Sequence, residues 1–197
     1  NYQSGKDQLA GFKRQFKGAV VAEVYTQLNQ PDYSAELTQL QALNPDAVFT
    51  FFPGGMGVNF IKQMSQNGLL NKIPLLTAST VDGTTLPALK DMALGTLGGA
   101  PWGPDLANPA NQAFVKAFEQ KYKRIPSQYA AQAYDSALVI DSALTKTKGV
   151  ASDKAALRAA IKSADFQSVR ANFKFDTNGF PIQDLGVFQV AKDAQNR

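Results

Sequence analysis

Residues 47–57 read Ala-Val-Phe-Thr-Phe-Phe-Pro-Gly-Gly-Met-Gly, and this stretch decides the fold. Its first part, residues 47–52, is apolar apart from one threonine, which is typical of a central parallel strand covered on both faces. The Pro-Gly-Gly that follows cannot continue a strand. Apolar residues then recur at helical spacing and predict a helix that ends at Asn67-Gly68. The apolar positions of that helix are Phe60, Ile61 and Met64.

Helices and strands alternate on both sides of this stretch. Upstream, helical spacing over residues 9–16 is followed by β-forming residues 19–25. Asp32 or Ser34 can then cap a helix that carries Leu37, Leu40 and Leu43. Downstream, the expected elements are a strand, a polar loop, a short helix and a strand, over residues 73–78, 79–84, 86–92 and 95–100. This alternation predicts an α/β fold with a parallel, doubly wound sheet.

The pattern changes at residues 101–104, Pro-Trp-Gly-Pro, which can continue neither a helix nor a strand. We expect a crossover between two lobes there. Residues 103–165 predict three amphipathic helices, and residues 170–191 predict two extended runs around a turn. The expected helix caps are Asn108, Ser127 and Ser152. Because these helices have no parallel strands of their own to cover, we expect their sheet to lie in polypeptide that precedes residue 1.

Composition disfavours catalysis. The 197 residues contain neither cysteine nor histidine, so thiolate metal sites, thiol nucleophiles and serine–histidine triads are excluded, and we expect no cofactor and no metal. No apolar run is long enough to span a membrane, and residues 1–6 do not resemble the start of a signal peptide, so any export signal lies outside the chain. The net charge of +4 is scattered in short patches, which favours solvated helix faces over nucleic-acid binding.

Several segments, taken together in their order and spacing, are similar to one known family. They are residues 2–5 (Tyr-Gln-Ser-Gly), 32–37 (Asp-Tyr-Ser-Ala-Glu-Leu), 45–49 (Pro-Asp-Ala-Val-Phe), 129–135 (Tyr-Ala-Ala-Gln-Ala-Tyr-Asp), 173–176 (Phe-Lys-Phe-Asp) and 186–189 (Gly-Val-Phe-Gln). Over essentially its whole length the chain resembles the type I periplasmic solute-binding proteins of the leucine/isoleucine/valine-binding family, which serve ABC importers.

The resemblance implies two α/β lobes with the ligand held in a cleft between them. Residues 1–101 correspond to most of the C-terminal lobe, residues 103–182 to part of the N-terminal lobe, and residues 183–197 to a return to the C-terminal lobe. The implied partners are a small carboxylate, a membrane permease and the missing N-terminal segment of the same protein, in the periplasm. By the same resemblance, we expect the part of the family's fold that supplies several contacts to the ligand's carboxylate to lie in that N-terminal segment.

The turn at residues 52–57 is one candidate ligand contact, because ligands of open α/β sheets approach the carboxyl ends of the strands and free backbone N–H groups there can hold an anion. Its glycine spacing matches neither a dinucleotide fingerprint nor a P-loop. A tight turn that needs small residues is the structural alternative.

Ser79 and Thr80 follow the next strand, where amino-acid-binding relatives carry an acidic residue for the ligand's ammonium group. Burying an ammonium without a paired charge costs about several kcal/mol, so the hydroxyl pair favours a neutral or hydroxylated ligand end unless Asp82 takes over. Capping of the loop is an equally ordinary role for both. Asp82 and Asp91 could pair for acid/base chemistry, but helix capping and surface exposure explain them better.

Aromatic and apolar residues complete the candidate site, although core packing is as good an explanation for any one of them. Tyr2 and Tyr129 match cleft-lining positions of the family, and Gln132 lies one turn from Tyr129. The full expected set of ligand contacts is Tyr2, Phe52, Pro53, Gly54, Gly55, Met56, Ser79, Thr80, Trp102, Tyr129 and Gln132.

The sequence thus favours a binding protein, not an enzyme, that captures a small organic carboxylate, with an aromatic acid as the leading class. A branched-chain amino acid is the alternative ligand. A nucleotide-binding regulator or an enzyme on a similar α/β sheet is the alternative from another class.

Overall fold

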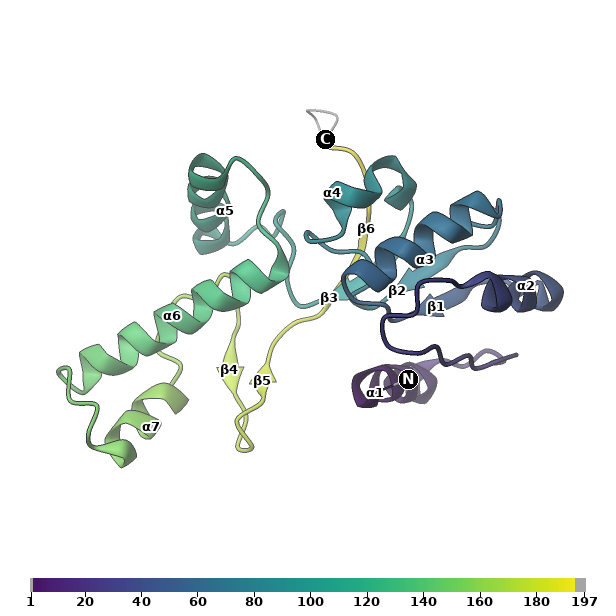
Figure 1. Cartoon of the computed structure of the whole chain (residues 1–197). Helices are drawn as coiled ribbons and strands as arrows, with labels where there is room; N and C mark the ends of the chain where they lie inside the picture. Colours follow the sequence, from purple (N-terminus) through teal and green to yellow (C-terminus); the bar gives the residue numbers. More distant parts are fainter. Residues whose placement is uncertain (1, 194–197) are drawn as a thin grey trace. The chain divides into compact units, whose positions relative to one another are not determined.

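A computed structural model of the chain describes residues 2–193 and divides it into two compact units (Figure 1). Unit 1 comprises Asn1–Gly99 and Val187–Arg197, and unit 2 comprises Ala100–Gly186. The last positions of the expected return, residues 194–197, lie outside the described residues. Each unit has its own buried apolar cluster and is described by itself.

Unit 1 is built on a four-stranded sheet whose order is β1-β2-β3-β6. The strands are β1 (Val48–Thr50), β2 (Leu75–Thr77), β3 (Leu97–Ala100) and β6 (Gly186–Gln189). β1 pairs with β2, and β2 with β3, in parallel, as the alternation of elements predicts. β6 runs antiparallel to β3, because Val190 bonds to Gly95 and Thr96 while Phe188 lies against Gly98. The parallel sheet therefore ends in one antiparallel edge strand.

Helices cover both faces of β1, as a doubly wound sheet requires. Alternate side chains of a strand point to opposite faces. Phe49 stacks on Phe12 with ring centroids 4.4 Å apart, whereas Val48 and Phe52 pack against the core cluster on the other face. The helices of unit 1 are α1 (Gln3–Gln15), α2 (Ser34–Leu43), α3 (Gly55–Gln66) and α4 (Leu86–Leu89), followed by the short 3-10 helix η1 (Lys90–Ala93).

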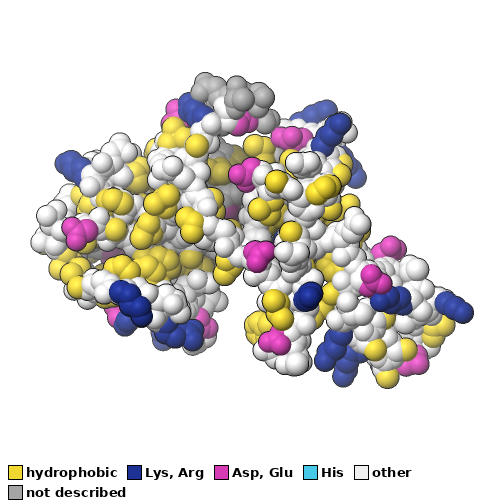
Figure 2. Space-filling model, turned by 180° about the vertical axis from the view of Figure 1, so that it is seen from behind, with side chains coloured by type: hydrophobic (Ala, Val, Ile, Leu, Met, Phe, Trp, Pro, Cys, Tyr) yellow, Lys and Arg dark blue, Asp and Glu magenta, His cyan; other side chains and the backbone are white. Residues whose placement is uncertain are grey.

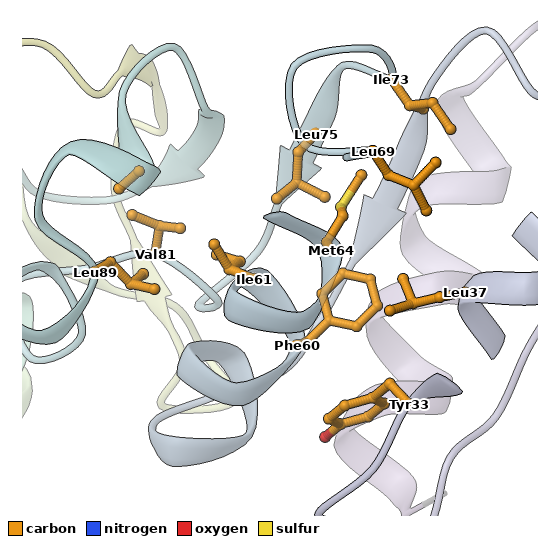
Figure 3. Packing of buried hydrophobic residues seen from close by; sticks show 11 residues of the cluster. Tyr33, Leu37, Phe60, Ile61, Met64, Leu69, Ile73, Leu75, Val81 and Leu89 are labelled. Atoms are coloured by element: carbon orange, nitrogen blue, oxygen red, sulfur yellow. The ribbon is translucent and has the colours of Figure 1, made fainter. Parts of the chain in front are cut away.

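The core of unit 1 lies between α2, α3 and the sheet (Figure 3). The predicted apolar stripe of α3 is confirmed, since Phe60, Ile61 and Met64 are all buried. Tyr33 and Leu37 reach the same cluster from α2 and the residue before it. Complete burial of a large apolar side chain contributes about 1.5–3 kcal/mol, so this cluster fixes α3 against the sheet.

The expected strand over residues 19–25 is wrong. That segment is neither helix nor strand, and Val21 is 62% exposed. The residues favour β structure, but a strand forms only where a neighbouring strand satisfies its backbone, and this segment does not join the described sheet. The expectation that residues 47–52 form a central strand is also wrong, because β1 lies at one edge of the sheet order.

Unit 2 contains the three predicted helices and a short hairpin. They are α5 (Pro109–Tyr122), α6 (Gln128–Lys146) and α7 (Lys154–Lys162), with β4 (Lys174–Phe175) antiparallel to β5 (Pro181–Ile182). Asn108 and Ser127 cap α5 and α6 as predicted. Ser152 does not cap α7, because the neighbouring Asp153 accepts the N–H groups of Ala155 and Ala156 at 3.1 and 3.0 Å.

Hydrophobic side chains reach the surface over much of the face drawn in Figure 2, and Lys and Arg lie among them in small groups. Within residues 2–193, no helix is both long and apolar enough to cross a membrane.

Candidate functional site

The candidate site lies where β1 and β2 end. Thr50 and Thr77, the last residues of the two strands, are register partners, so the chain leaves the sheet at neighbouring points. Two loops follow, over residues 51–54 and 78–85. The N–H of Ala78 donates to the carbonyl of Thr50 at 2.9 Å, which extends the pairing of the strands by one residue. The carboxyl edge of the sheet thus brings the residues predicted around 52–56 next to those predicted at 79–80.

The first loop turns into α3 through Gly54. Its backbone has φ +62° and ψ −134°, a conformation that side chains with a Cβ atom avoid, so glycine is required at this turn. The first bond within α3 is donated by Val58 to the carbonyl of Gly54 at 3.2 Å. The N–H groups of the preceding residues therefore have no acceptor in an earlier turn of the helix. Free N–H groups at a helix start attract anionic or electron-rich ligand atoms.

Gly57 belongs to the predicted turn at residues 52–57 but not to the expected ligand contacts, and it has a packing role in this site. A Cβ atom at this position would lie 2.3 Å from the carbonyl oxygen of Phe52 and 2.7 Å from that of Thr80. Glycine therefore allows the first turn of α3 to approach both loops. The signal in the sequence was the third glycine of Pro-Gly-Gly-Met-Gly, whose packing role appears only when the second loop is placed.

The predicted hydroxyl pair divides into two different environments. Ser79 is half-buried and takes a left-handed backbone conformation with φ +54°. Thr80 is completely buried, and its Oγ1 atom accepts the N–H of Phe52 at 2.8 Å. The Thr80 hydroxyl is therefore engaged inside unit 1, whereas Ser79 keeps a side chain that can reach solvent.

Asp82 shapes the second loop. Its Oδ1 atom accepts the N–H and the hydroxyl of Thr84, at 2.7 and 2.6 Å, and the N–H of Thr85 at 3.3 Å. Its Oδ2 atom is buried and has no hydrogen-bond partner among the described residues. The Asp82 carboxylate, the candidate partner for a ligand's ammonium group, therefore points into its own loop.

A hollow of about 220 Å³ opens beside the start of α3. It is lined by Pro53, Gly55 and Met56, all of which the sequence predicted. The remaining lining residues are Asn29, Gln30 and Asn59, whose amide side chains belong to no motif that predicts a ligand contact. A second hollow, of about 320 Å³, lies between α1 and residues 23–25 and contains none of the predicted residues.

The other predicted contacts are distributed over both units. In unit 1, Tyr2 is half-buried, with its ring centroid 6.2 Å from that of Phe51, and so lies on the α1 side of β1. In unit 2, Tyr129 is 46% exposed in the first turn of α6, and Gln132 is half-buried one turn along.

Trp102 is a core residue of unit 2. It is buried beside Phe114, and its indole N–H donates to Oδ1 of Asn111 at 2.7 Å. Nothing polar on this side chain is left for a ligand, and core packing, the alternative kept open above, accounts for it.

The residues described contain no group of three acidic side chains that could hold a metal ion. What unit 1 offers is a set of hydrogen-bond donors and half-buried apolar side chains where parallel strands end, which is the edge of an open α/β sheet at which ligands bind.

A model of the periplasmic binding protein family matches residues 1–195, and the chain belongs to this family. No curated protein sequence matches the chain.

Three solved structures illustrate the similarity. A solute-binding protein of an ABC transporter from R. palustris, in complex with benzoate, is 31% identical with a TM-score of 0.91, over 97% of this chain and 53% of that one. Another, from Rhodopseudomonas palustris BisB5 in complex with 3,4-dihydroxy benzoic acid, is 30% identical with a TM-score of 0.90, over 98% and 55%. A leucine-binding protein from Thermotoga maritima is 24% identical with a TM-score of 0.73, over 85% and 47%, and shows the fold alone. The chain spans about half the length of these proteins.

Proposed function

We propose that this chain forms part of the substrate-binding component of an ABC importer and that its ligand is a small aromatic carboxylate. The observation that carries the proposal is the 31% identity, over nearly the whole chain, to a solute-binding protein in complex with benzoate. A second protein of similar identity is in complex with a dihydroxybenzoic acid. The periplasm as its location and a membrane permease as its partner belong to the same proposal.

The half-site in unit 1 suits such a ligand. The N–H groups at the start of α3 and the hydroxyl of Ser79 supply hydrogen-bond donors for a carboxylate or a ring hydroxyl. Tyr2 and Met56 supply half-buried apolar surface for a ring. Tyr129 and Gln132 remain the contacts proposed from unit 2, whereas Phe52 and Thr80 support the loop from inside unit 1.

A branched-chain amino acid suits this half-site less well. Its ammonium group needs a carboxylate partner when it is buried, because an unpaired buried charge costs about several kcal/mol. Asp82 is the acidic residue in the loop after β2. Its Oδ1 atom already takes two N–H groups and a hydroxyl from that loop, and its Oδ2 atom is buried. A ligand without an ammonium group avoids this cost.

Calorimetric titration of the intact protein with benzoate, 3,4-dihydroxybenzoate and leucine tests the proposal. We expect saturable binding of the aromatic acids, weaker or no binding of leucine, and recovery of the added compound unchanged. At a ligand concentration of 100 times Kd, the protein should gain about 2.7 kcal/mol of stability against unfolding. Chemical conversion of the acid would support the enzyme alternative instead.

The variant Ser79→Glu tests whether Ser79 faces the ligand. A carboxylate at this position would oppose a bound anion, so we expect benzoate affinity to fall by at least about tenfold. Ser152→Glu is the matched control, because it makes the same change at an exposed position of unit 2. If Ser79→Glu binds benzoate as the unmodified protein does, Ser79 does not face the ligand.

A further inference from the structure

We infer that Thr80 is a positioning residue that joins the two loops of the candidate site, acting through the backbone of Phe52 without touching the ligand. The inference rests on the proposed function and deepens it. Thr80 is 0% exposed, so it has no surface on which a ligand could rest. Its role must therefore be expressed through the groups that surround it.

The Thr80 hydroxyl sits between the two strands and the first loop. Its Oγ1 atom accepts the N–H of Phe52 at 2.8 Å. The same atom lies 3.3 Å from Oγ1 of Thr50, and both threonines are buried. Thr50 is the last residue of β1 and Phe52 lies in the loop after it, whereas Thr80 lies in the loop after β2. This hydroxyl is thus a link between segments that are 28 residues apart in the sequence.

The rest of Thr80 is held as firmly as its hydroxyl. Its carbonyl accepts the hydroxyl of Thr85 at 3.2 Å, and Thr85 in turn accepts the N–H of Asp82 at 2.9 Å. On the other side, the Thr80 carbonyl and methyl face the position of Gly57, where a Cβ atom would lie 2.7 and 3.1 Å from them. Thr80 is therefore fixed by its own loop and by the first turn of α3.

This arrangement decides which backbone donors the site can offer. The N–H of Phe52 already donates to the Thr80 hydroxyl, and Pro53 has no N–H. The backbone donors left for a ligand therefore begin at the Gly54 turn and the start of α3. Loss of the Thr80 hydroxyl would leave the part-buried N–H of Phe52 without its acceptor and release the first loop from the second.

Thr80→Val tests the inference, because valine keeps the shape of threonine and removes only the hydroxyl. We expect benzoate affinity to fall by at least about tenfold, because a loosened site must be ordered on binding. We also expect amide hydrogen exchange at Phe52 to accelerate by at least about tenfold. Thr80→Ser keeps the hydroxyl, so both quantities should return to within about threefold of the unmodified protein.

Thr77→Val is the matched control. Thr77 is also buried, at 4% exposed, and its hydroxyl bonds to the carbonyl of Leu97 at 3.3 Å, a contact within the sheet that links no loop of the site. This variant loses a buried hydroxyl of the same kind, and we expect its benzoate affinity to stay within about threefold.

Three results would overturn the inference: unchanged affinity in Thr80→Val, an equal loss in Thr77→Val, or no recovery in Thr80→Ser. If the unmodified protein binds no aromatic acid, the proposed function fails. In that case the exchange rate of the Phe52 amide in the same variants still decides whether Thr80 joins the loops.

Discussion

The Nε atom of Arg170 donates to Oδ2 of Asp135 at 2.8 Å, in a salt bridge whose side chains are only 11% and 1% exposed. The carboxylate also accepts the hydroxyl of Ser168 at 2.6 Å and the N–H of Val169 at 3.0 Å. The Nη1 atom of the same guanidinium donates to Oε1 of Gln183 at 2.9 Å. Asp135 is therefore a fully bonded buried charge that ties the middle of α6 to residues 168–170.

Asp135→Ala should destabilise the protein by about 3–5 kcal/mol, because removal of one partner leaves the guanidinium of Arg170 without its buried counter-charge. Urea unfolding monitored by circular dichroism measures the change. Asp141→Ala, an exposed position on the same helix, should change stability by less than about 0.5 kcal/mol. Equal effects of the two substitutions would show that the salt bridge contributes nothing specific.

Tyr33→Phe should be neutral or stabilising by up to about 1 kcal/mol at pH 7. The Tyr33 side chain is 0% exposed, and its hydroxyl has no hydrogen-bond partner among the described residues, so its removal leaves no partner unsatisfied. The ring contacts with Phe52 and Phe60 survive in phenylalanine. A loss of more than about 1 kcal/mol in urea unfolding would mean that the hydroxyl is bonded after all.

The same substitution should change the response to alkali. Burial, and next the nearby Glu36 carboxylate, raise the pKa of Tyr33 above its usual value of 10.0. The unfolded chain therefore ionises this phenol first, so its contribution to stability is complete below about pH 10 and is lost as the pH rises through the folded pKa. Tyr33→Phe should lose less stability between pH 9 and about pH 11 than the unmodified protein. Urea unfolding of both proteins at the two pH values measures the difference.

Periodicity in the sequence was sufficient to predict helices with one buried apolar face, such as α3. It also revealed the alternation of helices and strands that predicts a parallel sheet. It was insufficient for residues 19–25, where β-forming residues lack a paired neighbour, because a strand depends on contacts remote in sequence. The alternation of helices and strands also made the candidate site predictable, because parallel strands end at one shared carboxyl edge. The division of Ser79 and Thr80 into an accessible and a buried hydroxyl was not, because it depends on the side chains that surround the loop.

Asp153→Ala should destabilise the protein by about 1 kcal/mol, because the carboxylate caps α7 through the N–H groups of Ala155 and Ala156. The sequence pattern favoured Ser152 for this role, so Ser152→Ala is the informative control and should be neutral within about 0.5 kcal/mol. Thermal unfolding of both variants measures the difference. A larger loss for Ser152→Ala than for Asp153→Ala would restore the serine as the cap.

Gly57→Ala should destabilise the protein by about 1–3 kcal/mol, because the added methyl would meet two carbonyl oxygens, of Phe52 and Thr80, at 2.3 and 2.7 Å. Neither oxygen belongs to a flexible side chain, so the loops or the first turn of α3 must move. Gly11→Ala makes the same chemical change inside α1, where nothing lies within 4 Å of the new methyl. It should stabilise the protein by about 0.5–1 kcal/mol, since alanine favours a helix. Opposite signs in urea unfolding would establish the close approach of α3 to both loops, whereas a neutral Gly57→Ala would show that the two loops lie farther apart.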